Sequence, residues 1–157
     1  MKNCIIIHGT EGHPEENWFP WLKEQMKKYG YLVITLQFPT PEKQNPEAWL
    51  KVFKKYEQLL NRDTILIGSA GVKPIKYYEI DRPFVQDPFN WEKIRDSSEH
   101  FLVFHSEDDP LICIGNGEKI AGELGADLIR LKDAGHFNSK AGYKKFELLL
   151  EKLKPIL

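Results

Sequence analysis

The sequence predicts an α/β fold, a three-layer sandwich with helices on both faces of a mostly parallel central sheet. Two observations carry this prediction. Continuous apolar runs without polar alternation occur at residues 3–7, 64–67 and 101–105, as expected of parallel strands that are covered on both faces. Between such runs, apolar residues recur at three-to-four spacing, which is typical of helices packed on a sheet. Strands that alternate with helices form parallel units with right-handed crossovers.

In the first half of the chain we expect strands at residues 3–7, 31–36 and 64–67, and helices at 15–29 and 46–60. Gly30 is a natural residue to follow the end of the first helix, because glycine adopts the left-handed conformation without strain. Asn45 and Pro46 mark the start of the second helix, with Asn as the N-cap and Pro in the first helical position. Breakers at Pro39 and Pro41 close the second strand.

In the second half we expect a short strand at 75–80, a loop at 81–88, one or two helical turns at 91–95, and strands at 101–105 and 127–131. A helix is expected at 117–124, ended by Gly125. Lys73-Pro74 disfavours a helix directly before the short strand. Ser139 is the expected cap of a final helix whose buried stripe runs from Tyr143 to Leu153. With no repeat or linker, the chain is expected to be a single domain of 157 residues, which buries roughly 70% of its unfolded surface.

The composition of the chain limits the kinds of partner that it can bind. The chain has 22 basic and 23 acidic residues and a net charge of −1, which argues against nucleic acid and anionic membranes as partners. Cys4 and Cys113 are too few for a disulfide framework, so we expect two reduced thiols in a cytoplasmic protein. The apolar run after Met1 is too short for a signal peptide or a spanning helix. A small-molecule acyl substrate, the partner that the candidate site and the resemblance described below imply, is compatible with this composition.

Candidate catalytic residues follow three different predicted strands. Ser69 follows the run 64–67, Asp109 follows the run 101–105, and His136 follows the strand 127–131. Because the carboxyl ends of parallel strands meet at one edge of a sheet, we expect the three side chains to lie at the same edge. A serine hydroxyl needs a histidine to take its proton, and that histidine needs a carboxylate to orient it. Their order along the chain, Ser, Asp, His, is the α/β-hydrolase order.

Two backbone N–H groups would complete such a site by binding the oxyanion. The natural donors are Ala70, directly after the serine, and Thr10, in the loop after the first strand. Asp108 is the second candidate for the carboxylate. Each residue also has a structural interpretation, in which Ser69 is a small turn residue, His136 a loop histidine and Asp109 the start of a turn.

Metal and phosphate sites are the alternatives that we weigh. The side chains of His8, His13, His105, His136 and Asp108 could be assembled into a metal site, but no pair has the spacing of a metalloprotease helix. Residues 68–71 could cradle a phosphate, but they lack both the P-loop lysine and the glycine spacing of dinucleotide-binding proteins. We therefore expect neither a metal nor a cofactor.

Five motifs resemble the small serine hydrolases of the α/β-hydrolase superfamily that are related to the retinoblastoma-binding serine hydrolase. They are His8-Gly9-Thr10-Glu11-Gly12, Asn17-Trp18-Phe19-Pro20-Trp21-Leu22, Asp87-Pro88-Phe89-Asn90-Trp91, His105-Ser106-Glu107-Asp108-Asp109-Pro110 and Gly135-His136-Phe137. The resemblance implies a minimal α/β-hydrolase fold and an esterase-like activity on small esters or amides. It also implies a catalytic triad, matched here by Ser69, Asp109 and His136.

The chain departs from the superfamily at the nucleophile. The usual pattern is Gly-x-Ser-x-Gly, whereas Gly68 directly precedes Ser69 here. Few residues separate Ser69 from the expected strand at 75–80, too few for a crossover with a helix. We therefore expect the nucleophile helix to be absent or much shortened. The apolar surface that this exposes could be covered by Tyr77 and Tyr78, by a rearranged segment, or by a second subunit.

Two hypotheses follow. The first is a serine hydrolase that uses the Ser69, Asp109 and His136 triad. The second is a hydrolase-fold protein without that chemistry, which keeps a pocket or a partner surface.

Overall fold

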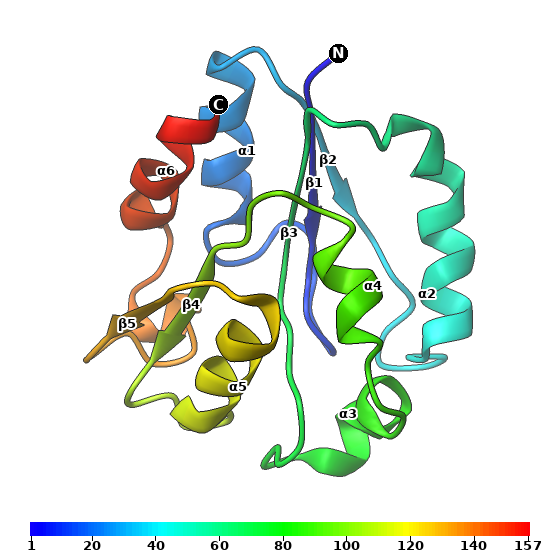
Figure 1. Ribbon diagram of the computed structural model, residues 1–157, viewed down its shortest axis with the longest axis vertical. Coiled ribbons are helices and arrows are strands. Elements are labelled where there is room, and N and C mark those ends of the chain that lie inside the picture. The colour runs from blue at the N-terminus through cyan, green and yellow to red at the C-terminus, as the bar shows by residue number, and fades with distance from the viewer. The chain divides into compact units, whose positions relative to one another are not determined.

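The computed structural model describes residues 1–157, and the chain divides into two compact units. The first unit comprises Met1–Ala70 and Gly142–Leu157, and the second comprises Gly71–Ala141. Each unit has its own parallel sheet (Figure 1). The α/β fold class is confirmed, with every strand pairing parallel and with helices between the strands. The five strands are distributed over two sheets.

Strand β1 (Asn3–Ile7) is the centre of the first unit. It lies between β2 (Leu32–Leu36) and β3 (Thr64–Gly68) and runs parallel to both. Cys4 and Ile5 are completely buried, which explains the unbroken apolar run in this part of the sequence. Burial also raises the pKa of the Cys4 thiol to about 12, so Cys4 is a protonated core residue and no candidate nucleophile.

The helices of the first unit are α1 (Phe19–Lys28), α2 (Pro46–Phe53), the 3-10 helix η1 (Lys54–Leu59), α6 (Glu147–Leu153) and the 3-10 helix η3 (Lys154–Ile156). Helices α1 and α6 lie side by side (Figure 1), and the Trp18 ring meets the Phe146 ring edge-on at 5.4 Å between centroids. The expected caps are confirmed. Gly30 follows α1 with φ +81°, and Asn45 Oδ1 accepts a hydrogen bond from the Ala48 N–H at 2.9 Å.

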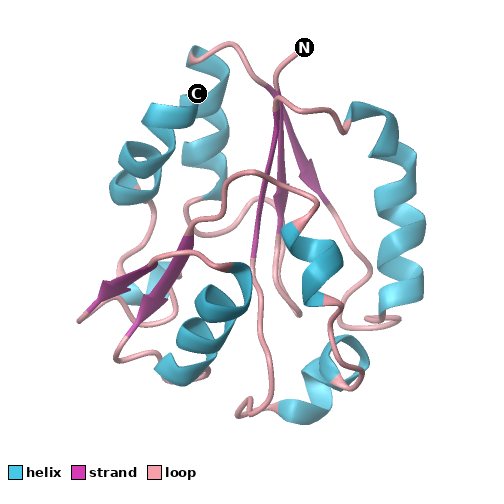
Figure 2. Ribbon diagram, in the orientation of Figure 1, coloured by secondary structure: helices cyan, strands magenta, loops and turns pink.

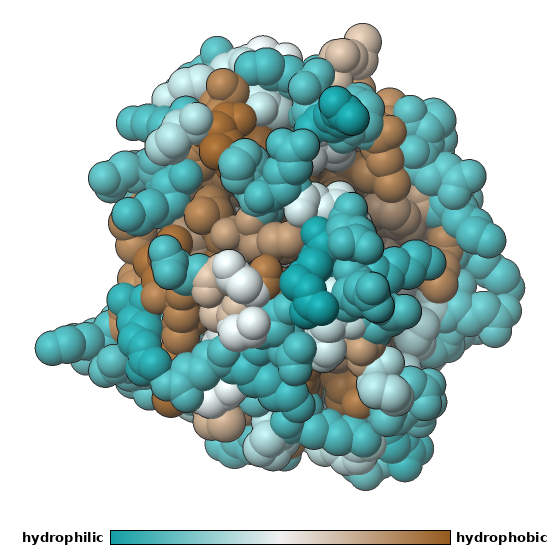
Figure 3. Space-filling model, in the orientation of Figure 1, coloured by the Kyte–Doolittle hydropathy of each residue, from teal (hydrophilic) through white to brown (hydrophobic).

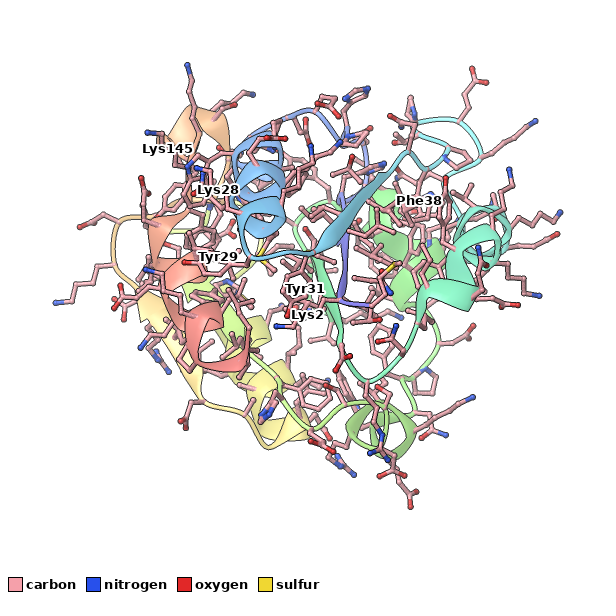
Figure 4. All side chains as sticks on the ribbon, turned by 90° about the horizontal axis from the view of Figure 1, so that it is seen from above. Lys2, Lys28, Tyr29, Tyr31, Phe38 and Lys145 are labelled. Atoms are coloured by element: carbon pink, nitrogen blue, oxygen red, sulfur yellow. The ribbon has the colours of Figure 1, made fainter.

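Surface features of the first unit are visible in two views. Lys2 and Tyr31, at the beginnings of adjacent strands, lie side by side in Figure 4, and the Lys2 ammonium is 5.4 Å from the centre of the Tyr31 ring. Helix α2 has no fully buried residue and Leu50 is 55% exposed. Hydrophobic surface is accordingly visible where α2 lies, on the right of Figure 3.

The second unit contains β4 (Val103–Ser106) and β5 (Leu128–Leu131), which pair in parallel and are joined by α5 (Ile114–Leu124). The remaining elements are α3 (Tyr78–Val85), α4 (Trp91–Arg95) and the 3-10 helix η2 (Ser139–Ala141), all visible in Figure 2. Gly125 ends α5 with φ +65°, as the sequence predicts. No helix of the chain is both long enough and apolar enough to span a membrane.

Several predicted elements differ in the structure. The predicted strand at 75–80 is wrong, and so is the first part of the predicted loop at 81–88, because Tyr78–Val85 is helix α3. This helix is stabilised by acidic residues in its first turn and by the Glu79–Arg82 ion pair at 3.0 Å. The final helix begins at Glu147, since Gly142 has φ +88° and separates it from η2. The first helix begins at Phe19, since Asn17 has φ +54° and lies outside helical conformation.

Candidate active site

Asp109 and His136 form a hydrogen-bonded pair in the second unit. Asp109 lies in the turn after β4 and His136 in the turn after β5, so the parallel pairing of these strands places both residues at the same end of the sheet. Nδ1 of His136 is 2.8 Å from Oδ2 of Asp109. A carboxylate can only accept, so Nδ1 carries the proton, and in the neutral ring Nε2 is left as a base.

Asp109 is held rigidly from its other side. Its Oδ1 accepts hydrogen bonds from the N–H groups of Leu111 at 2.8 Å and Ile112 at 3.1 Å. Only 6% of its side chain is exposed, against 38% for His136. A buried carboxylate with both oxygens bonded has one orientation, so it can fix the tautomer and direction of the histidine ring.

The electrostatics of the pair favour its charged form. Burial raises the pKa of Asp109, but the hydrogen bonds from His136, Leu111 and Ile112 outweigh it and hold that pKa below its ordinary value. The hydrogen bond to Asp109 raises the pKa of His136, against the opposing effect of burial, and the charges of Asp109 and Asp81 add to the increase. Asp109 therefore stabilises an imidazolium at position 136.

Asp108, the second candidate for the carboxylate, has a different role. Its Oδ1 accepts hydrogen bonds from the Ser106 hydroxyl and from the N–H groups of Ala134 at 3.1 Å and Gly135 at 2.8 Å. The hydrogen bond from Ser106, followed by that from Gly135, lowers the pKa of Asp108. Asp108 thus stabilises the turn that contains His136, whereas Asp109 contacts the histidine itself.

Ser69 lies in the first unit, directly after β3, and is exposed. At Gly9, in the loop after β1, an added methyl group would lie 3.3 Å from the Ser69 hydroxyl oxygen. Thr10 directly follows Gly9, and Ala70 directly follows Ser69. The two predicted oxyanion donors are therefore the neighbours in sequence of the two residues that approach each other. The structure therefore brings Ser69 together with the 8–12 loop in one unit and Asp109 with His136 in the other.

No helix follows Ser69. Residues 69–77 contain no helix or strand, and the first helical residue after β3 is Tyr78, which confirms that the usual nucleophile helix is absent. Asn116 of α5 holds the segment that replaces it. Its Oδ1 accepts from the Val72 N–H at 2.7 Å, and its Nδ2 donates to the Pro74 carbonyl at 2.8 Å. Tyr77, one of the residues that could cover apolar surface here, is 52% exposed.

Two of the histidines considered as metal ligands are buried and bonded to the backbone. Nε2 of His105 contacts the carbonyl of Ile112 at 3.0 Å, and both ring nitrogens of His8 contact backbone groups. No group of three or more His, Cys, Asp or Glu side chains is placed to hold a metal ion. The structural roles of His8 and Asn116 were not anticipated from the sequence, since nothing in their neighbourhood identifies the distant backbone that each one contacts.

A parallel α/β fold with an aspartate–histidine pair at its strand ends defines a protein of the α/β-hydrolase class. The protein-family model described as "Serine hydrolase" matches residues 72–155 of this chain. This is more than half of the 157 residues, so the chain belongs to the serine hydrolase family. The matched range includes Asp109 and His136, and it begins three residues after Ser69.

Relatives match along nearly the whole chain. YdeN of Bacillus subtilis (strain 168) is 24% identical over 97% of this chain and 94% of its own length, and the serine hydrolase RBBP9 of Rattus norvegicus is 23% identical over 98% and 97%. The crystal structure of the ydeN gene product superposes with a TM-score of 0.92 over 99% of this chain and 98% of that one. Est1E from Butyrivibrio proteoclasticus, solved with ferulic acid, has a TM-score of 0.60 at 14% identity, over 98% and 90%.

The alignment with YdeN spans 179 positions, 22 more than the 157 residues of this chain. At least that many positions of the alignment are therefore gaps in this chain. A shortened segment is consistent with the helix-free stretch after Ser69.

Proposed function

We propose that this chain is an esterase-like serine hydrolase that cleaves a small ester or amide through an acyl-enzyme intermediate. Ser69 is the nucleophile, His136 is the general base and then the general acid, and Asp109 orients His136. The N–H groups of Thr10 and Ala70 bind the oxyanion. The substrate is a small acyl compound, and the reaction needs neither a metal nor a cofactor.

The observation that carries the proposal is the bond between Asp109 and His136. Such a bond fixes the histidine with Nδ1 protonated and Nε2 basic, which is the state that accepts a proton from a serine. Membership of the serine hydrolase family supports the same chemistry. The close approach of Gly9 to the Ser69 hydroxyl supports Ser69 as the partner of the oxyanion loop.

The reaction balances in two steps. The Ser69 oxygen bonds to the acyl carbon while its proton passes to Nε2 of His136, and the same proton then goes to the leaving alkoxide or amine as the bond to it breaks. In the second step, a water oxygen bonds to the acyl carbon while a water proton passes to Nε2. That proton then goes to the Ser69 oxygen as the acyl–serine bond breaks, which releases the acid and the free serine. In both steps a negative charge develops on the carbonyl oxygen, where N–H donors stabilise it.

A fluorophosphonate probe tests the proposal, because it forms a covalent bond only with an activated serine. We expect one adduct on wild type, mapped by mass spectrometry to the peptide with Ser69, and none on Ser69→Ala or His136→Ala. Ser98→Ala is a matched control, since Ser98 is exposed and bonds only locally, to the His100 carbonyl at 2.9 Å. Wild type that neither reacts with the probe nor hydrolyses p-nitrophenyl acetate contradicts the proposal.

The second candidate function is a binding module that has the hydrolase fold without the chemistry. The absence of a helix after Ser69 favours it, because the N-terminus of that helix normally supplies an oxyanion donor and a favourable dipole. In that case the apolar surface left by the missing segment would bind a partner or a second copy of the chain. Ester hydrolysis that disappears in Ser69→Ala excludes this candidate.

A further inference from the structure

His8 is buried at the end of β1, with 1% of its surface exposed. Its Nε2 accepts a hydrogen bond from the Phe38 N–H at 3.0 Å, and its Nδ1 is 2.7 Å from the carbonyl oxygen of Gly9. The first contact requires an unprotonated Nε2 and the second requires a proton on Nδ1. Both contacts together admit only the neutral ring with its proton on Nδ1.

The surroundings of His8 hold the ring in place. Its centroid is 5.4 Å from those of Phe38 and Trp49, and both contacts are edge-on. Phe38 lies beyond the end of β2, beside α2 (Figure 4), and Trp49 belongs to α2. The ring therefore joins the loop after β1 to the segment after β2, all within the first unit.

The Gly9 carbonyl belongs to the same peptide group as the Thr10 N–H. A peptide group is planar and trans, so its C=O and N–H point in opposite directions. The Gly9 oxygen accepts two hydrogen bonds, from His8 Nδ1 at 2.7 Å and from the Gly12 N–H at 3.1 Å. Fixing this oxygen consequently fixes the direction of the Thr10 N–H, one of the two oxyanion donors of the proposed function.

The loop has a second attachment to the same neighbouring segment. Glu11 has φ +56°, a conformation that is strained for a residue other than glycine, and its N–H donates to Oε1 of Gln44 at 2.7 Å. The Thr40 hydroxyl donates to the same Gln44 oxygen at 2.6 Å. Residues 38–44 thus hold the loop at its beginning, through His8, and again at Glu11.

We propose that His8 is a positioning residue, whose Nδ1–H sets the orientation of the Gly9–Thr10 peptide so that the Thr10 N–H meets the oxyanion beside Ser69. This inference rests on the proposed function. His8 does not touch the reacting atoms, and it acts through the backbone. Without its proton donor, the peptide loses one of the two hydrogen bonds that prevent it from rotating.

Two substitutions separate the contacts of the ring. An asparagine at position 8 can place an amide N–H near the position of Nδ1, and a glutamine can place an acceptor near the position of Nε2. We expect His8→Asn to keep kcat within about threefold of wild type, since the Gly9 contact is restored. We expect His8→Gln to lower kcat about 10-fold to 100-fold at unchanged KM, approaching the loss of a whole oxyanion donor.

Two measurements make the test complete. Hydrolysis of p-nitrophenyl acetate gives kcat and KM for wild type and both variants, with the melting temperature as the measure of folding. The ring nitrogen shifts of His8, from a ¹⁵N NMR spectrum of the full chain, give its tautomer. A proton on Nε2, or on both nitrogens, overturns the inference whatever the activity.

The remaining outcomes distinguish this inference from the proposed function. Active wild type with His8→Gln at full kcat overturns the positioning role alone. Equal loss of kcat in His8→Asn and His8→Gln also overturns it, because restoring the Gly9 contact then does not restore activity. A loss in His8→Asn alone overturns it as well, because the role then belongs to the Phe38 contact. Wild type without hydrolysis or probe reaction overturns the proposed function together with the positioning role of His8.

Discussion

Oδ2 of Asp109 accepts a hydrogen bond from Nδ1 of His136 at 2.8 Å, between two residues that lie 27 positions apart in the sequence. The opposite oxygen of the same carboxylate is occupied by two backbone N–H groups. Asp109 therefore cannot turn away from His136 without breaking three hydrogen bonds. One oxygen of Asp109 thus holds the turn and the other contacts His136, so a substitution can change the contact with His136 and leave the contacts with the turn in place.

Asp109→Asn should remove most of the activity with little change in the fold. The amide oxygen still accepts from Leu111 and Ile112, but the amide N–H then faces Nδ1 of His136 and favours the wrong tautomer. We expect kcat for p-nitrophenyl acetate to fall about 10³-fold to 10⁴-fold.

Asp108→Asn is the matched control, because the two carboxylates are adjacent and only Asp109 contacts His136. We expect Asp108→Asn to lower the melting temperature, since it weakens the turn held by the Ser106 and Gly135 contacts. We expect it to lower kcat much less than Asp109→Asn does. Equal losses of kcat in the two variants would show that the assignment of the carboxylate is wrong.

The pH dependence of hydrolysis should show the raised pKa of His136. The base must be neutral, so kcat/KM should rise with pH through a midpoint above about 6.5, the ordinary histidine value. In Asp109→Asn the hydrogen bond and charge that raise this pKa are lost, and the midpoint should move to lower pH. A pH–rate profile of both proteins checks this, and identical midpoints would contradict it.

The stability that the Asp109–His136 pair contributes should change with pH in a predictable direction. The His136 contribution is complete below its unfolded pKa, about 6.5, and disappears as pH rises through the raised folded pKa. The Asp109 contribution is complete above its unfolded pKa, about 3.9, and disappears as pH falls through the lowered folded pKa. Urea unfolding should therefore show a larger loss of stability in Asp109→Asn at about pH 5.5 than at about pH 8.5. A difference that is independent of pH would contradict the coupling.

Gly9→Ala should disturb Ser69 more than it disturbs the fold. The new methyl group would lie 3.3 Å from the Ser69 oxygen, so either the serine or the loop must move by a few tenths of an ångström. Small displacements of reacting groups have large effects on rate, and we expect probe reaction with Ser69 to slow about 10-fold or more. The rate of adduct formation measures this, and an unchanged rate at an unchanged melting temperature would argue against a role for the loop.

Two glycines of α5 should respond to the same substitution with opposite signs. At Gly117 a methyl group would come within 2.7 Å of the His105 side chain, so Gly117→Ala should lower the free energy of unfolding by about 1–3 kcal/mol. At Gly122 it meets nothing within 4 Å, so Gly122→Ala should raise that free energy by about 0.5–1 kcal/mol. Urea unfolding gives the free energy of unfolding of both variants. Changes of the same sign would contradict the packing of α5 on β4.

Local patterns in the sequence were sufficient for most elements. Continuous apolar runs predicted β1, β3 and β4 to within a few residues, and the caps at Gly30, Asn45 and Gly125 were read correctly because capping is a contact between near neighbours. The segment at 75–80 was misread as a strand. Its aromatic and β-branched residues favour a strand by propensity, but helix α3 is stabilised by charges further along the chain.

By itself the sequence determined the α/β class, the order of the candidate residues along the chain and the loss of the helix after Ser69. These follow from the period of apolar residues, from chain order and from the length of a connection. Only the tertiary structure decided that Asp109 faces His136 while Asp108 holds a turn, and that His8 is a neutral ring bonded to Phe38 and Gly9. The reason is physical: the direction of a side chain depends on which distant N–H or C=O groups the fold brings within hydrogen-bonding distance.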